Sequence, residues 1–215
     1  MTSGRSGPTL ETVAPLRQID PTGIYHVMSR GNFRQPVHLD EAHYAKKVQL
    51  LTRVARQRRW IVLDWCLITN HHHLVIQLTE NGLSDGMRDL NGCFSRWSNL
   101  QTGRTNTGHL IKNRFKLVSV TGESHFRELL RYVPINPVAH GEVETIEEWR
   151  WSGYRANIGL EHPFPFHQPA ELLRYFGANP ATAVERYKAF VHEGLVRGGH
   201  LPRSDHGFNV VRSEA

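Results

Sequence analysis

Three consecutive histidines, His71, His72 and His73, lie between the two most apolar segments of the chain, residues 61–68 and 74–78. Both segments are short and rich in β-branched residues, which predicts buried strands. Side chains of an extended chain alternate between the two faces of a sheet, so His71 and His73 share one face and His72 points to the other. Two imidazoles on one face of a rigid strand form half of a metal site.

A second pair of reactive side chains lies about sixty residues later. Tyr132 and Asn136 are four residues apart in a helical pattern over residues 123–136, so they share a helix face. An ionised tyrosine is a nucleophile, and an asparagine oxygen can bind a hard metal ion. Two other interpretations stay open at this point: Tyr132 as an ordinary packing or surface residue, and Asn136 as a helix C-cap. Pro134 between them removes a helical hydrogen bond and predicts a kink.

The order of elements that position these residues is that of an α+β protein. Strands are expected at residues 24–28, 61–68, 74–78 and 114–120, with helices after Asp40 and over 84–100 and 123–136, which predicts a small antiparallel or mixed sheet. Residues 161–197 are expected to form a small helical appendage. Residues 1–21 are expected to be a flexible leader and residues 198–215 a disordered tail.

Composition indicates which classes of partner the protein is expected to bind. The 215 residues carry a formal charge of +6 and a pI of about 9.6, which makes nucleic acid the first partner to consider. The two cysteines have no CxxC spacing, so a cytoplasmic protein is expected, and the sequence has no apolar run long enough for a membrane span. Lys46, Arg53 and Arg56 lie opposite the apolar stripe of the first helix. They are either DNA contacts or an ordinary solvated face.

Four segments together resemble one family, the single-tyrosine HUH transposases, and most of all the REP-associated tyrosine transposases. The segments are Ile-Thr-Asn-His-His-His-Leu at 68–74, Arg-Tyr-Val-Pro-Ile-Asn-Pro-Val at 131–138, Tyr-His-Val-Met-Ser-Arg-Gly-Asn at 25–32 and Trp-Arg-Trp-Ser-Gly-Tyr-Arg at 149–155. The resemblance covers residues 22–160. The middle histidine, His72, departs from the family pattern, where this position is apolar.

The resemblance implies a ferredoxin-like antiparallel sheet with helices packed on one face, followed by the helical appendage. It also implies that His71, His73 and Asn136 bind Mg²⁺ or Mn²⁺, and that Tyr132 attacks a phosphodiester to form a 5′-phosphotyrosine.

The expected partner is single-stranded DNA with hairpin or palindromic repeats, in the bacterial nucleoid. The resemblance leaves open whether the protein is a monomer or a homodimer. The candidate contacts to the DNA backbone are Lys46, Arg53, Arg56, Lys112, Arg114 and Lys116. Two alternatives remain: a non-catalytic or host-adapted DNA-hairpin-binding protein, and a small metal-dependent hydrolase that uses water as its nucleophile.

Overall fold

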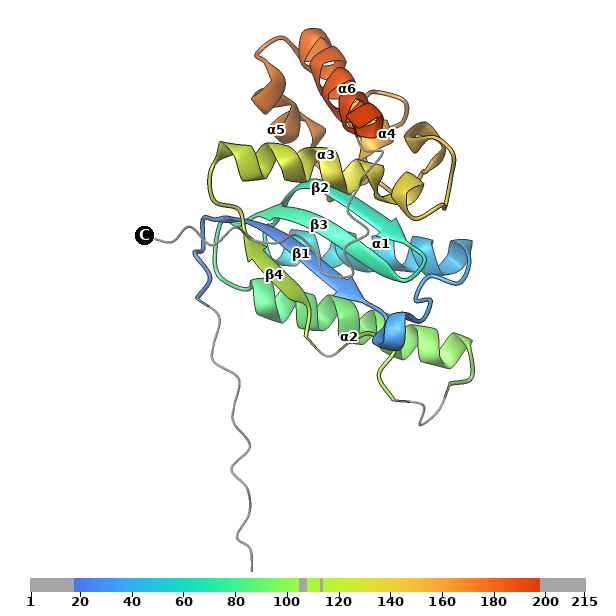
Figure 1. Ribbon diagram of the computed structural model, residues 1–215. Coiled ribbons are helices and arrows are strands. Elements are labelled where there is room, and N and C mark those ends of the chain that lie inside the picture. Colours follow the sequence, from blue (N-terminus) through green and yellow to red (C-terminus); the bar gives the residue numbers. More distant parts are fainter. Residues whose placement is uncertain (1–17, 105–107, 113, 198–215) are drawn as a thin grey trace, which may run out of the picture.

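A four-stranded antiparallel sheet forms the centre of the protein (Figure 1). The computed structural model describes residues 18–104, 108–112 and 114–197. The strands are β1 (Ile24–Arg30), β2 (Ile61–Ile68), β3 (His71–Gln77) and β4 (Lys116–Ser119), in the order β2-β3-β1-β4. The α+β class predicted from the sequence is confirmed. Residues 1–17 of the predicted leader and all of the predicted tail lie outside the described residues.

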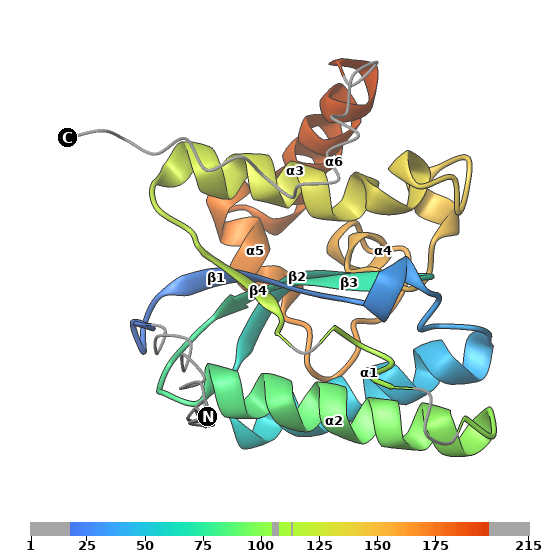
Figure 2. The ribbon, with the colours of Figure 1, turned by 60° about the horizontal axis from the view of Figure 1, so that its bottom comes forward.

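Helices cover both faces of this sheet (Figure 2). The long helices α1 (Glu41–Gln57) and α2 (Leu83–Gln101) lie on one face, and α3 (Glu123–Ala139) lies on the other with α6 (Pro180–Arg197) packed behind it. The expectation of helices on one face only is therefore corrected. The shorter elements are η1 (Asn32–Arg34), η2 (Ile146–Glu148), α4 (Tyr154–Asn157), α5 (Pro169–Leu173) and η3 (Arg174–Phe176).

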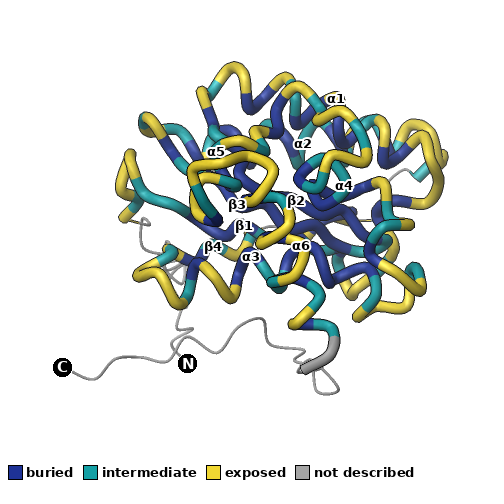
Figure 3. The backbone as a smooth tube through the Cα atoms, turned by 90° about the horizontal axis from the view of Figure 1, so that it is seen from above, coloured by how far each residue is buried: buried dark blue, intermediate teal, exposed yellow. Residues whose placement is uncertain are grey.

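The sequence of β2 explains why both faces are covered. Trp65 and Leu67 pack into the core under α1 and α2, whereas Cys66 and Ile68 pack into the core under α3. A strand that is apolar on both sides must be buried on both sides. Figure 3 shows the strands buried between exposed outer loops.

The first helix follows the pattern that its sequence predicts. The Asp40 carboxylate accepts a hydrogen bond from the backbone N–H of His43 at 2.9 Å and so caps the helix. The expected apolar stripe is buried. Its members are Tyr44, Val48, Leu51 and Ala55.

The tyrosine helix α3 runs through Pro134 and Pro137 without interruption and ends three residues beyond Asn136. Pro137 has no N–H to offer the Val133 carbonyl. The Asn136 amide donates instead, at 3.5 Å to Val133 and at 2.7 Å to the carbonyl of Tyr132. The C-cap residue is His140, so the interpretation of Asn136 as a C-cap is wrong.

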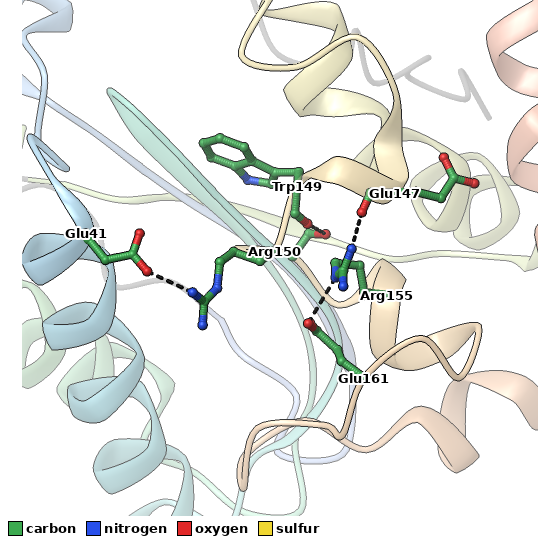
Figure 4. A network of polar contacts seen from close by, with 7 residues as sticks. Glu41, Glu147, Trp149, Arg150, Arg155 and Glu161 are labelled. Carbon is green, nitrogen blue, oxygen red and sulfur yellow. Dashed lines mark hydrogen bonds and ion pairs between the residues drawn. The ribbon is translucent and has the colours of Figure 1, made fainter.

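The segment after α3 closes the outer edge of β2. Ser152 pairs with Cys66, and His167 pairs with Val62. Arg150 joins this segment to Glu41 of α1 at 2.9 Å, and an ion pair between Arg155 and Glu161 lies beside it (Figure 4).

The helical appendage shares a core with α3. Tyr187 and Val191 of α6 belong to the same buried cluster as Leu130 and Val133. Within the described residues, no helix is both long and apolar enough to cross a membrane.

Candidate active site

The histidine strand presents its side chains as its alternation predicts. His73 pairs with Met28 of β1 and with Cys66 of β2. Val75, two residues further along β3 and therefore on the same face, packs under α3. His71 and His73 therefore lie on the α3 face of the sheet, with ring centroids 4.8 Å apart. His72 is buried on the opposite face, under α1 and α2.

Hydrogen bonds leave one nitrogen of each site histidine available to a ligand. Nδ1 of His71 lies 2.6 Å from Oδ1 of Asn70, and because that oxygen only accepts, Nδ1 donates and Nε2 keeps its lone pair. Nδ1 of His73 lies 2.8 Å from Nε2 of His26. Among the described residues, Nε2 of His73 is buried without a hydrogen-bond partner.

Both site histidines are neutral at physiological pH. Burial, reinforced by the charge of Arg30, lowers the pKa of His71 to about 2. Burial also holds the pKa of His73 well below its usual value. A neutral imidazole has the free electron pair that a metal ion needs.

Asn136 supplies an oxygen to the same face. Its amide nitrogen is held by the backbone of its own helix, whereas its Oδ1 is buried and has no hydrogen-bond partner in the described part of the chain. Residues 18–104, 108–112 and 114–197 contain no group of three His, Cys, Asp or Glu side chains that could hold a metal. The Asn136 oxygen is a ligand of the kind that a hard divalent metal ion accepts.

Tyr132 lies against the histidines of its own chain. Its ring centroid is 5.3 Å from that of His73, in an edge-to-face arrangement, and 6.2 Å from that of His26. Burial raises the pKa of Tyr132, and the Asn136 side chain and the charge of Arg30 oppose that rise. Within a single chain, the structure thus brings together the four residues singled out for chemistry.

Four further residues of the site were missed by the sequence reasoning. Arg30 ends β1 on the α3 face, where its charge acts on both His71 and Tyr132. His26 lies on the same face of β1 and Asn70 in the turn before β3. The ring of His140 is 5.0 Å from that of His71. Spacing could have revealed two of them, because His26 alternates with Arg30 along β1, and His140 follows Asn136 by one helical turn.

The predicted DNA contacts fall into two groups. Lys46, Arg53 and Arg56 lie on α1, across the sheet from Tyr132. Lys116 lies on the tyrosine side of β4, opposite Met28, and it influences the pKa of His26. The backbone N–H of Lys112 donates to the Arg30 carbonyl at 2.9 Å, and Arg114 is exposed between these two lysines. A role in DNA contact stays a prediction for all six.

His72 faces a second group of buried polar side chains. Burial holds its pKa well below the usual value, and the nearby Lys47 contributes to this shift. The Lys47 ammonium donates to Oδ1 of Asn91 at 3.1 Å and lies over the ring of Phe94. His72 is therefore a neutral core residue on the far side of the sheet, as its position in the strand predicts.

The sheet carries its histidine, tyrosine and asparagine side chains in the arrangement that the resemblance to single-tyrosine transposases predicts. The chain belongs to the IS200-like transposase family, whose profile matches residues 21–136.

One relative is the REP-associated tyrosine transposase of Escherichia coli K12, 27% identical over 110 residues, which span 50% of this chain and 62% of the relative. A solved structure of a REP-associated tyrosine transposase bound to a REP hairpin matches with a TM-score of 0.57 and 21% identity. That match covers 72% of this chain and 90% of the other, and it confirms the fold.

Proposed function

We propose that this protein cleaves single-stranded DNA beside a hairpin and transfers the cut strand through a covalent tyrosine intermediate. The observation that supports this most directly is the position of Tyr132, 5.3 Å from His73 between ring centroids, beside two imidazole nitrogens and an amide oxygen that are free to bind a ligand. The similarity to a REP-associated transposase solved with a REP hairpin supports hairpin DNA as the partner.

His71, His73 and Asn136 would hold a divalent metal, Mg²⁺ or Mn²⁺, through two nitrogens and one oxygen. When bound, such an ion polarises the scissile phosphate and spreads the negative charge of the transition state. His26 and Asn70 act behind the ligands. By bonding the Nδ1 atoms of His73 and His71, they fix the ring orientations and would leave each Nε2 to bind the metal.

Tyr132 carries out the substitution at phosphorus. Its phenol oxygen loses a proton and forms a bond to the phosphorus, the bond from phosphorus to the 3′ oxygen breaks, and that oxygen takes up a proton to become a 3′-OH. The positive charge of Arg30 opposes the rise in the pKa of Tyr132 that burial causes. The same charge would attract the phosphate that Tyr132 attacks.

One experiment tests the chemistry. The full chain is incubated with end-labelled oligonucleotides that carry an imperfect palindrome, with Mn²⁺ or with EDTA. We expect a covalent protein–DNA adduct that requires metal and is absent in Tyr132→Phe. The phenylalanine variant is a matched control because it keeps the ring packed against His73 and removes only the hydroxyl.

Two other outcomes contradict the proposal in different ways. Binding to the palindrome without cleavage in any metal would indicate a DNA-binding protein that has lost its activity. Cleavage that persists in Tyr132→Phe would indicate a hydrolase with a water nucleophile.

A further inference from the structure

Phe33 lies in the turn that follows β1, and its ring projects into solvent. With 95% of its surface accessible, it is the most exposed large apolar residue in the described part of the chain. The backbone at this point is strained, because Phe33 has a φ of 50° and Arg34 a φ of 59°. Residues other than glycine rarely adopt this left-handed backbone conformation, and those that do are concentrated at functional sites.

The turn that carries Phe33 is held firmly from both sides. On one side the backbone N–H of Asn32 donates to the Leu110 carbonyl at 2.9 Å. On the other side the N–H of Gly31 donates to the Asn70 carbonyl at 2.8 Å. A β-carbon at Gly31 would overlap the carbonyl of Gln35, so the tight turn requires glycine there. The exposed ring is thus displayed by a rigid turn.

Asn70 connects this turn directly to the active site. Its Oδ1 accepts from His71, and its Nδ2 lies 3.5 Å from the carbonyl of Arg34. One side chain therefore contacts both a predicted metal ligand and the residue next to Phe33. A strand that crosses the turn would arrive beside His71.

The surroundings of the turn carry positive charge. Residues 24–39 include Arg30 and Arg34 and no acid, and residues 90–122 include five Lys or Arg and no acid. Arg104 donates to the side chain of Gln35 at 2.8 Å, and Lys112 pairs with Arg30 through its backbone. In Figure 1 the blue η1 segment lies beside the green segment that follows α2. Exposed aromatic rings among basic side chains are the means by which proteins stack unpaired bases.

We propose that Phe33 is a stacking platform for an unpaired base of the strand that enters the active site. This inference rests on the DNA-binding part of the proposed function. Stacking on an aromatic ring tolerates every base, because each base has a π-face. The platform would therefore contribute affinity for single strands and little discrimination among sequences.

The test compares single-stranded and duplex DNA of one sequence, a fluorescent 20-nucleotide oligonucleotide and its annealed form, in EDTA so that cleavage does not interfere. Phe33→Leu keeps an apolar side chain and removes the ring, and Phe33→Trp keeps a ring. By anisotropy we expect Phe33→Leu to weaken single-strand binding at least about fivefold, with duplex binding unchanged and Phe33→Trp within about twofold of the wild type. Thermal unfolding should be the same for all three proteins, because the side chain is exposed.

Equal single-strand affinity of the wild type and Phe33→Leu would overturn the inference. An equal loss for single-stranded and duplex DNA would also overturn it, since that result indicates a contact to the backbone. The adduct assay with Tyr132→Phe separates this inference from the cleavage proposal. If adducts form and Phe33→Leu binds normally, only the stacking role fails; if the ring matters and no adduct forms, only the cleavage proposal fails.

Discussion

Asp64 gives the sharpest prediction about stability. It lies at the bulge of β2 and is fully buried, and burial raises the pKa of its carboxyl to about 8. Oδ1 accepts from the backbone N–H of Trp65 at 2.9 Å, whereas Oδ2 has no hydrogen-bond partner among the described residues. The folded protein therefore holds this carboxyl in its neutral form.

The sign of the pH dependence follows from this difference. The carboxyl has a pKa of 3.8 when exposed in the unfolded chain and about 8 in the folded protein. Between these values the folded state binds more protons than the unfolded state, so stability falls as pH rises. At about 1.4 kcal/mol per pH unit, the penalty grows by about 4 kcal/mol between pH 5 and pH 8.

Asp64→Asn keeps the shape of the side chain and removes its titration. We expect the free energy of unfolding, measured by urea denaturation, to shift in favour of the variant by roughly 4 kcal/mol between pH 5 and pH 8. Asp89→Asn, on the surface beside Arg58, is the control and should show no such divergence. A difference between wild type and Asp64→Asn that does not change from pH 5 to pH 8 would refute the reasoning.

Two more predictions concern the stability contributed by a buried lysine and the turn that positions the histidines. Lys47 is buried, and burial lowers its pKa to about 7 from 10.5, so its own contribution to stability should rise as pH rises from 7 to 10.5. Lys47→Met should remove this contribution in urea denaturation, and a dependence on pH equal to that of the wild type would contradict the burial argument. The Glu142 carboxylate accepts from the N–H of Thr69 at 3.0 Å and from its hydroxyl at 2.8 Å, which fastens the turn before the histidines. Glu142→Ala should cost about 1–3 kcal/mol in unfolding and slow adduct formation, whereas full activity at reduced stability would show that the turn does not position His71.

Much of this architecture follows from local patterns in the sequence. The apolar stripe of α1, with its Asp40 cap, predicts the helix and its buried face. Alternation in β3 predicts which histidines share a face, because each strand residue has only two directions available. The placement of Tyr132 and Asn136 on one helix face needs only their spacing of four.

The remaining parts depend on contacts between segments far apart in the sequence. Helices cover both faces because β2 is buried on both sides, and local periodicity does not reveal which helix packs on which face. The pairing of His26 with His73 requires the register of β1 against β3. The buried position of Lys47 was also not predicted, because a lysine in an amphipathic helix is normally solvated.

The covered edge of β2 has a consequence for the order in which the chain is made. Ser152 pairs with Cys66 but is synthesised roughly 86 residues later. At ~5–20 residues per second, the outer edge of β2 stays open on the ribosome for about 4 to 17 s. An apolar strand with unpaired backbone groups is prone to join other chains during that time. When the segment around Ser152 pairs with β2, it therefore also protects the nascent chain from aggregation through this edge.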